Sequence, residues 1–215
     1  MLRFFDISYD ELNAVNAQEL YQLRKITFQD RLNWNVSCVN NMENDRYDNT
    51  HTTYIIGECK GKIICSVRFI NLEHSNMITH TFNHCFNHVN LPGNYVESSR
   101  FFVDKKRAKP LLGNDYPISI ALYLAMINYV RKRKYEGIYT IVSRAMLTIL
   151  KRTGWNIAVI QEAYLKPNEP IYLLDLPIDL ESQSLMKNKI YQSLAQPILL
   201  PEQWPFSLPT SGRKG

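Results

Sequence analysis

The order of elements along the chain predicts an α/β fold in which helices cover a mixed β-sheet. A strand and a helix come first, several strands follow one another, and helices then alternate with strands. Hydrophobic residues make up 45% of the 215 residues, which is enough for one sizeable core. We therefore expect a single domain over residues 1–206, followed by a disordered tail over 207–215, where the pattern is lost.

The first elements follow from local patterns. Arg3–Ile7 is a short apolar run typical of a strand, and apolar residues at helical spacing predict a helix over Glu11–Arg31 with Asp10 as its cap. Arg24 and Phe28 lie four residues apart beside the apolar stripe, so we expect them to line the rim of a pocket. The polar, Asn-rich stretch 33–50 has no period and predicts a long loop.

The rest of the chain alternates apolar runs with turn residues, apart from a basic stretch, Lys105–Pro110, that reads as a loop. Strands are predicted over Thr53–Cys59, Lys62–Asn71, Tyr95–Asp104, Ile138–Ser143, Ile157–Leu165 and Ile171–Leu176. Helices are predicted over Tyr116–Lys134, Ala145–Arg152 and Leu180–Leu194.

Charge and cysteine content narrow the function classes. The net charge of +5 is modest and does not call for a nucleic-acid partner. The cysteines Cys38, Cys59, Cys65 and Cys85 form no CxxC pair, which favours free thiols in a reducing compartment. The N-terminus does not resemble a signal peptide, and the longest apolar stretch is too short to span a bilayer. We expect a cytoplasmic protein that binds no membrane.

Polar residues at the start of an otherwise apolar strand point to a site. The apolar run Phe-Phe-Val is preceded by Glu97, Ser99 and Arg100. The side chains at this polar end need water or polar partners. A second set of charged and aromatic residues lies upstream, namely Arg24, Phe28, Trp34, Asp45, Asp48 and Arg68.

These residues together resemble the signature of the acyl-homoserine-lactone synthases, the bacterial autoinducer synthases. The phrase Glu-Ser-Ser-Arg-Phe-Phe-Val over 97–103 is similar to the central motif of that family, and the match runs from the first helix to about Leu176. The resemblance implies a three-layer αβα sandwich around a splayed sheet, similar to the N-acetyltransferases of the GNAT type. It also implies that an acyl group moves from acyl carrier protein to the amine of S-adenosylmethionine. Lactone closure then expels methylthioadenosine.

The residue chemistry is compatible with this reaction. Glu97 is the candidate base that takes the amine proton, directly or through water. Ser99 shares its strand face, whereas Arg100 faces away unless a bulge or its own length brings it round. Arg24 can pair with a substrate carboxylate or with an aspartate, and the sequence leaves both open.

The resemblance also assigns the acyl group and its carrier. It implies an acyl slot of modest depth, suited to about six to eight carbons, in which the Thr140 hydroxyl donates to a 3-oxo group. The slot is lined by Met126, Thr140, Val142, Met146 and Leu150. Basic helix ends, with Lys151 and Arg152, are expected to meet the acidic carrier protein. We expect a monomer with no cofactor, since S-adenosylmethionine is a substrate.

Three other interpretations compete with this one. An acetyl-CoA-dependent N-acetyltransferase would need a Gly-rich turn for the pyrophosphate, but Asp104–Gly113 contains one glycine, and Pro110 lacks a donor. A non-enzymatic basic module would leave the polar strand start without a purpose. His80, His84 and His88 recur at a spacing that could hold zinc on a helix, but the family pattern has no metal there, and we expect none.

Overall fold

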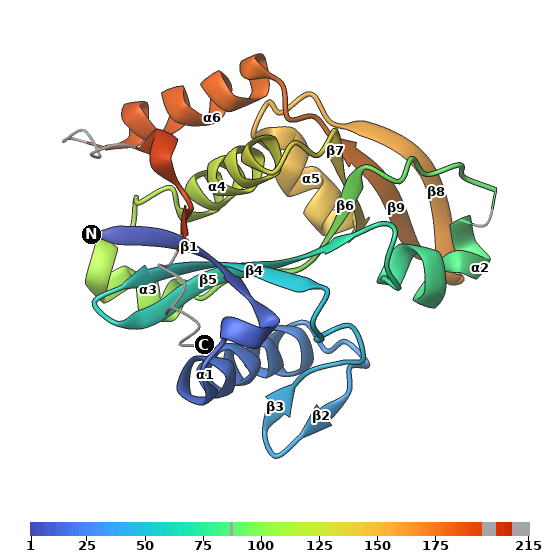
Figure 1. Ribbon diagram of the computed structural model, residues 1–215, viewed down its shortest axis with the longest axis horizontal. Coiled ribbons are helices and arrows are strands. Elements are labelled where there is room, and N and C mark those ends of the chain that lie inside the picture. Colours follow the sequence, from blue (N-terminus) through green and yellow to red (C-terminus); the bar gives the residue numbers. More distant parts are fainter. Residues whose placement is uncertain (87, 195–200, 208–215) are drawn as a thin grey trace, which may run out of the picture.

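The computed structural model describes residues 1–86, 88–194 and 201–207, and in these residues one eight-stranded sheet forms the centre of the molecule (Figure 1). The strand order is β10-β1-β4-β5-β6-β7-β9-β8. The β1–β10 and β6–β7 pairs are parallel and the other pairs are antiparallel, so the sheet is mixed as predicted. The strands are β1 (Leu2–Ser8), β4 (Thr52–Cys59), β5 (Lys62–Asn71), β6 (Tyr95–Val103), β7 (Gly137–Ser143), β8 (Ala158–Lys166), β9 (Glu169–Leu176) and β10 (Phe206–Ser207).

Helices cover both faces of the sheet and give a three-layer arrangement (Figure 1). Helices α4, α5 and α6 lie on one face, and α1 with the small β2–β3 hairpin lies on the other. The helices are α1 (Ala14–Lys25), α2 (Asn83–Phe86), α3 (Lys105–Leu112), α4 (Ile118–Lys132), α5 (Arg144–Arg152) and α6 (Leu180–Ser193). Short 3-10 helices lie at Tyr9–Glu11 and Pro201–Gln203, and short π-helices lie at Ile26–Arg31, directly after α1, and at Met77–Thr81.

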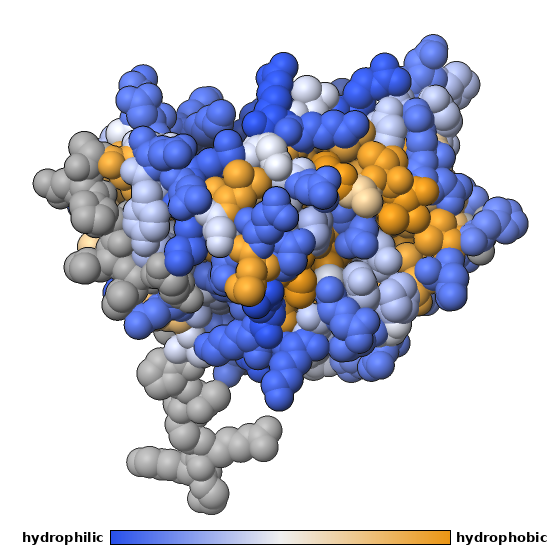
Figure 2. All heavy atoms as spheres, turned by 90° about the horizontal axis from the view of Figure 1, so that it is seen from above, coloured by the Kyte–Doolittle hydropathy of each residue, from blue (hydrophilic) through white to orange (hydrophobic). Residues whose placement is uncertain are grey.

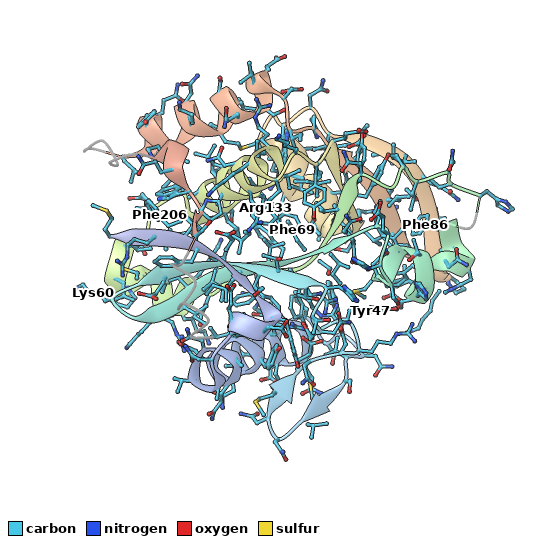
Figure 3. The ribbon with its side chains drawn as sticks, viewed as in Figure 1. Tyr47, Lys60, Phe69, Phe86, Arg133 and Phe206 are labelled. Atoms are coloured by element: carbon cyan, nitrogen blue, oxygen red, sulfur yellow. The ribbon has the colours of Figure 1, made fainter. Side chains whose placement is uncertain are left out.

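The larger core lies between the sheet and α4. This helix is buried on nearly all sides, as its apolar sequence predicts, because it packs on the sheet below and on α6 beside it. Phe69 of β5 points up to α4, where its ring stacks on that of Tyr129 at 5.4 Å (Figure 3). The removal of the apolar side chains of α4 from water is the main force that holds the helix on the sheet.

Two predictions near the N-terminus are wrong, one on a helix cap and one on burial. Asn13, not Asp10, caps α1, because the Asn13 side chain accepts a hydrogen bond from the Asn16 amide at 2.9 Å. Arg24 and Phe28 are buried, not on a rim, with exposed fractions of 1% and 2%. Burial of Arg24 is possible because two carboxylates from the following loop pair with it.

The stretch Lys105–Pro110, predicted to be a loop, belongs to α3. Asp104 caps this helix by accepting from the Arg107 amide at 3.0 Å, and Gly113 ends it with φ of +86°. The loop prediction over 33–50 holds except for a hairpin of β2 (Cys38–Val39) and β3 (Met42–Glu43). Asn40 and Asn41 both have positive φ, which suits the tight turn that joins these strands.

The C-terminal prediction can be followed only in part. Ser207, placed in the tail, pairs with Asp6 in the sheet, and the rest of the tail lies outside the described residues. The single domain over 1–206 stays a prediction. Among the helices described, none has the length and apolar character needed to cross a membrane.

Candidate active site

The site is centred where two parallel strands separate. β6 and β7 pair from Tyr95–Gly137 to Ser98–Thr140, and no paired residues follow. At this last pair, the Thr140 hydroxyl donates to the Ser98 carbonyl at 2.8 Å. The sheet is therefore splayed here, as the family resemblance implied.

A bulge in β6 aims its polar residues. On β5, Arg68 pairs with Ser99 and Ser66 pairs with Phe102, so one residue of β5 faces two residues of β6. Arg100 takes up the extra position with φ of +55°, a conformation that costs a non-glycine residue about 1–2 kcal/mol. The bulge brings Arg100 to the same face as Ser99. Strict alternation along the strand would have placed it on the opposite face.

Three arginines and three carboxylates form one network on this face, which we call the ion cluster. Arg24 donates to Glu43 at 2.6 Å and to both Asp48 oxygens at 2.7 and 3.0 Å. Arg68 donates to Asp45 at 2.6 Å and to Asp48 at 3.1 Å. The members of the cluster are Arg24, Arg68, Arg100, Glu43, Asp45 and Asp48.

Arg100 closes the network from the β6 side. Its guanidinium donates to Glu43 at 3.0 Å and to Asp45 at 2.8 Å. Glu43 is fully buried and bridges Arg24 of α1 to Arg100 of β6. The network therefore joins the long loop to both the helix and the sheet.

Opposite charges outweigh desolvation within the cluster. Burial raises the pKa of the Asp48 carboxyl, but Arg24 and Arg68 outweigh it and hold that pKa well below its usual range. Burial lowers the pKa of Arg24, yet Asp48 and Glu43 more than offset this, so the net pKa is raised. Tyr54 also donates to Asp48, at 2.8 Å. Arg24 and Asp48 therefore stay charged at neutral pH, and their pairing can order the loop.

Glu97 lies beside this cluster and is 2% exposed. Its carboxylate accepts from the Met77 amide at 3.1 Å and is also hydrogen-bonded to Ser99. Burial raises the pKa of Glu97, although Arg68 and Arg100 act in the opposite direction. A buried carboxylate with a raised pKa is a suitable proton acceptor near neutral pH.

The two predicted aromatic residues lie together. The rings of Phe28 and Trp34 stack with centroids 5.2 Å apart, and Trp34 is 44% exposed. The Arg100 guanidinium lies 5.6 Å from the Phe28 ring. This pair forms an aromatic wall at the edge of the ion cluster, on a segment that leads from α1 into the loop.

The residues predicted to line the acyl slot gather on the opposite face of the sheet. Met126 of α4, Val142 of β7 and Leu150 of α5 belong to the larger core, and Met146 packs against it. Thr140 is buried where the strands part. One cavity of about 290 Å³ lies between α3 and the start of α4, another of about 360 Å³ lies beside Asn128, and neither is lined by these slot residues.

The predicted docking residues are accessible. Lys151 and Arg152 end α5 and are exposed. Figure 2 looks onto the face covered by α4, α5 and α6, where apolar side chains gather between charged ones. Ile149 of α5 and Ile160 of β8 are exposed apolar residues.

Two parts of the site were not predicted. Glu43 lies in an aperiodic loop next to Met42, and only its carboxylate could have drawn attention to it. Met77 contributes its backbone amide, and a backbone amide gives no signal in the sequence because nearly every residue has one. In the described residues no three His, Cys, Asp or Glu side chains are grouped to hold a metal, and the His80 ring hydrogen-bonds to Thr79.

Comparison with known proteins adds independent findings. Residues 8–186 match the family described as autoinducer synthase. A protein from Enterobacter agglomerans named acyl-homoserine-lactone synthase is 56% identical over 209 residues, which cover 97% of each chain.

Solved structures agree on the fold. A CoA-dependent acyl-homoserine lactone synthase, BjaI, with SAM and isopentyl-CoA matches with a TM-score of 0.76 at 17% identity, over 89% of this chain and 90% of that one. An acyl-CoA N-acyltransferase from Pseudomonas aeruginosa matches with a TM-score of 0.55 at 13% identity, over 82% and 99%. The fold is thus of the N-acyltransferase type, as the sequence predicted.

Proposed function

Since the chain belongs to the autoinducer synthase family and is an acyl-homoserine-lactone synthase, we propose that its substrates are S-adenosylmethionine and an acylated carrier protein. The acyl group moves to the amine of S-adenosylmethionine, and ring closure then releases methylthioadenosine. The observation that carries this proposal is the buried Glu97 carboxylate at the point where β6 and β7 part.

The first step is deprotonation of the substrate amine, since an α-amino group has an ordinary pKa of about 8 and is largely protonated at neutral pH. Glu97 accepts the proton because its own raised pKa brings the two groups closer in basicity. The Met77 amide and Ser99 hold the carboxylate in place while it works. The neutral amine nitrogen then attacks the thioester carbonyl.

In the second step a carbon–nitrogen bond forms, the carbon–sulfur bond of the thioester breaks, and the carrier leaves as a thiol. The tetrahedral intermediate carries an oxyanion that needs donors. The β6–β7 pairing ends at Ser98, so N–H groups on the following edge of β6 do not donate to β7 and can face the oxyanion.

Lactone closure needs positioning more than acid–base help. The substrate carboxylate attacks its own γ-carbon, the bond to the sulfonium breaks, and methylthioadenosine leaves as a neutral thioether. Alignment of this kind is worth up to about 7–11 kcal/mol in ideal intramolecular cases. The stacked Phe28 and Trp34 rings offer a wall for the sulfonium or the adenine.

We assign the substrate carboxylate to Arg68. One terminal nitrogen of its buried guanidinium, Nη2, has no hydrogen-bond partner in the part of the chain that the structure describes. The other guanidinium contacts of the ion cluster are already made within the protein. The cluster therefore shapes the pocket, and the two N–H donors of Nη2 remain to bind an anion.

A carrier protein fits the basic end of α5 as acyl donor. Lys151 and Arg152 are exposed there, and carrier proteins are acidic. The first helix after β6 is capped by Asp104, whose carboxylate accepts from the Arg107 amide, one of the helix N-terminal N–H groups that a CoA pyrophosphate would use in an acetyltransferase. The slot on the other side of the sheet takes the acyl chain, and flexible Met126 and Met146 can move to admit it.

The test is to incubate the protein with S-adenosylmethionine and 3-oxohexanoyl carrier protein, and in parallel with 3-oxohexanoyl-CoA or acetyl-CoA. We expect equal amounts of acyl lactone and methylthioadenosine by mass spectrometry, with the carrier protein as the better donor. If no chain length on carrier protein or CoA yields a lactone, the proposal is wrong. Better turnover with CoA would overturn the choice of donor alone.

A further inference from the structure

A buried hydroxyl without a partner lies on the acyl side of the sheet. Tyr123 of α4 is 1% exposed, and its hydroxyl has no hydrogen-bond partner among residues 1–86, 88–194 and 201–207. A hydroxyl removed from water without a partner is unfavourable, so such groups in native proteins usually have a purpose.

The ring that carries this hydroxyl is held firmly. It stacks on Phe101 of β6 with centroids 5.0 Å apart and tilts against Trp155 at 5.5 Å. The Trp155 indole N–H does not pair with the hydroxyl: it cannot accept the hydroxyl proton, and its own proton is already donated to the Pro177 carbonyl at 2.9 Å. The hydroxyl is therefore fixed in position and free to donate. Burial also raises the pKa of Tyr123, so the proton stays on at neutral pH.

The position of Tyr123 points to the acyl chain. Met126 lies one turn further along α4 on the same side, and both belong to the core cluster that contains Val142 and Leu150. Phe101 comes just after the bulge of β6, so Tyr123 lies close to the opening between the strands. Tyr123 therefore lies where an acyl chain would lie if it entered the slot through the opening between β6 and β7.

The Thr140 hydroxyl is less free than that of Tyr123. It already donates to the Ser98 carbonyl, and it can donate to a ligand only by giving up this bond. A carbonyl oxygen on the ligand accepts and cannot donate. In the part of the chain that the structure describes, the Tyr123 hydroxyl is a free donor beside the slot.

Resting on the proposed function, we infer that Tyr123 is a specificity-determining residue whose hydroxyl donates a hydrogen bond to an oxygen at the 3-position of the acyl chain. The enzyme then favours 3-oxoacyl donors over unsubstituted donors of the same length. Binding such a chain gives the buried hydroxyl its partner, whereas an unsubstituted chain leaves it unpaired.

The experiment compares kcat/KM for 3-oxohexanoyl and hexanoyl carrier protein in the wild type and in Tyr123→Phe. We expect the wild type to prefer the 3-oxo donor and the variant to lose about tenfold of this preference. Tyr129→Phe is the matched control, because it removes another buried hydroxyl of α4 that is bonded to Thr53 instead. Its preference should equal that of the wild type.

The outcomes separate the two proposals. A thermal unfolding midpoint of Tyr123→Phe at or above the wild-type value would agree with an unpaired hydroxyl, and a clear fall would contradict it. An unchanged preference in Tyr123→Phe, or a preference lost only in Thr140→Val, overturns the inference while the lactone synthase activity stands. If the wild type makes no lactone from either donor, the proposed function fails and takes the inference with it.

Discussion

Replacing Glu43 by glutamine removes one charge from the ion cluster and keeps the shape of the side chain. The cluster balances three guanidinium groups against three carboxylates. Glu43 is fully buried and contacts Arg24 at 2.6 Å and Arg100 at 2.9 Å, so its loss leaves a buried excess of positive charge. Breaking a buried ion pair from one side costs about 3–5 kcal/mol.

For a chain of this size, each kcal/mol lowers the unfolding midpoint by about 2–4 °C, so we expect a fall of about 6–20 °C. Thermal unfolding followed by circular dichroism measures it. The control is Glu58→Gln, which breaks the 3.4 Å surface pair with Arg3 and should cost less than about 1 kcal/mol. If Glu43→Gln unfolds within 2 °C of the control, a difference of less than about 1 kcal/mol, the cluster does not stabilise the loop.

Three further predictions concern the reaction and its pH dependence. Glu97→Gln should lower kcat by about 10²–10⁴-fold in the lactone assay with the fold intact, and normal turnover would remove this carboxylate from the mechanism. Because the folded pKa of Glu97 is raised above its ordinary 4.5, its ionisation destabilises the fold as pH rises through that interval. The stability of Glu97→Gln relative to the wild type should therefore increase with pH in urea titrations, and a constant difference would contradict the raised pKa. Joint replacement of Lys151 and Arg152 by glutamate should raise KM for the carrier protein about tenfold with little change in kcat, whereas Lys60→Glu, in the β4–β5 turn far from α5 (Figure 3), should leave KM unchanged. Equal effects of both changes would show that only net charge matters.

The sequence predicts most elements because their signals are local. The strands β4, β5 and β7 and the helix α4 are found within a residue or two of their predicted bounds, since apolar periodicity and turn residues mark them directly. α3 was missed because a run of Lys and Arg with a proline resembles a loop, although Asp104 in the capping position was a usable signal.

The site is a different matter, because its contacts join distant parts of the chain. The motif residues were identified as one set, and the structure brings Arg24, Arg68 and Arg100 into one network. The burial of Arg24 could not be predicted, because helical periodicity places it beside the apolar stripe and only Glu43 and Asp48 make its burial possible. Periodicity likewise treats Tyr123 as one more apolar residue and says nothing about whether its hydroxyl finds a partner.

The strand β6 presents alternate side chains to two separate environments. Glu97 and Ser99 face the ion cluster, while Phe101 and Val103 pack toward α4. One strand thus separates the face that carries the ion cluster from the face that packs against α4. In the proposed function the acyl chain is selected under α4, so substitutions there can change the acyl group of the product while the ion cluster stays the same.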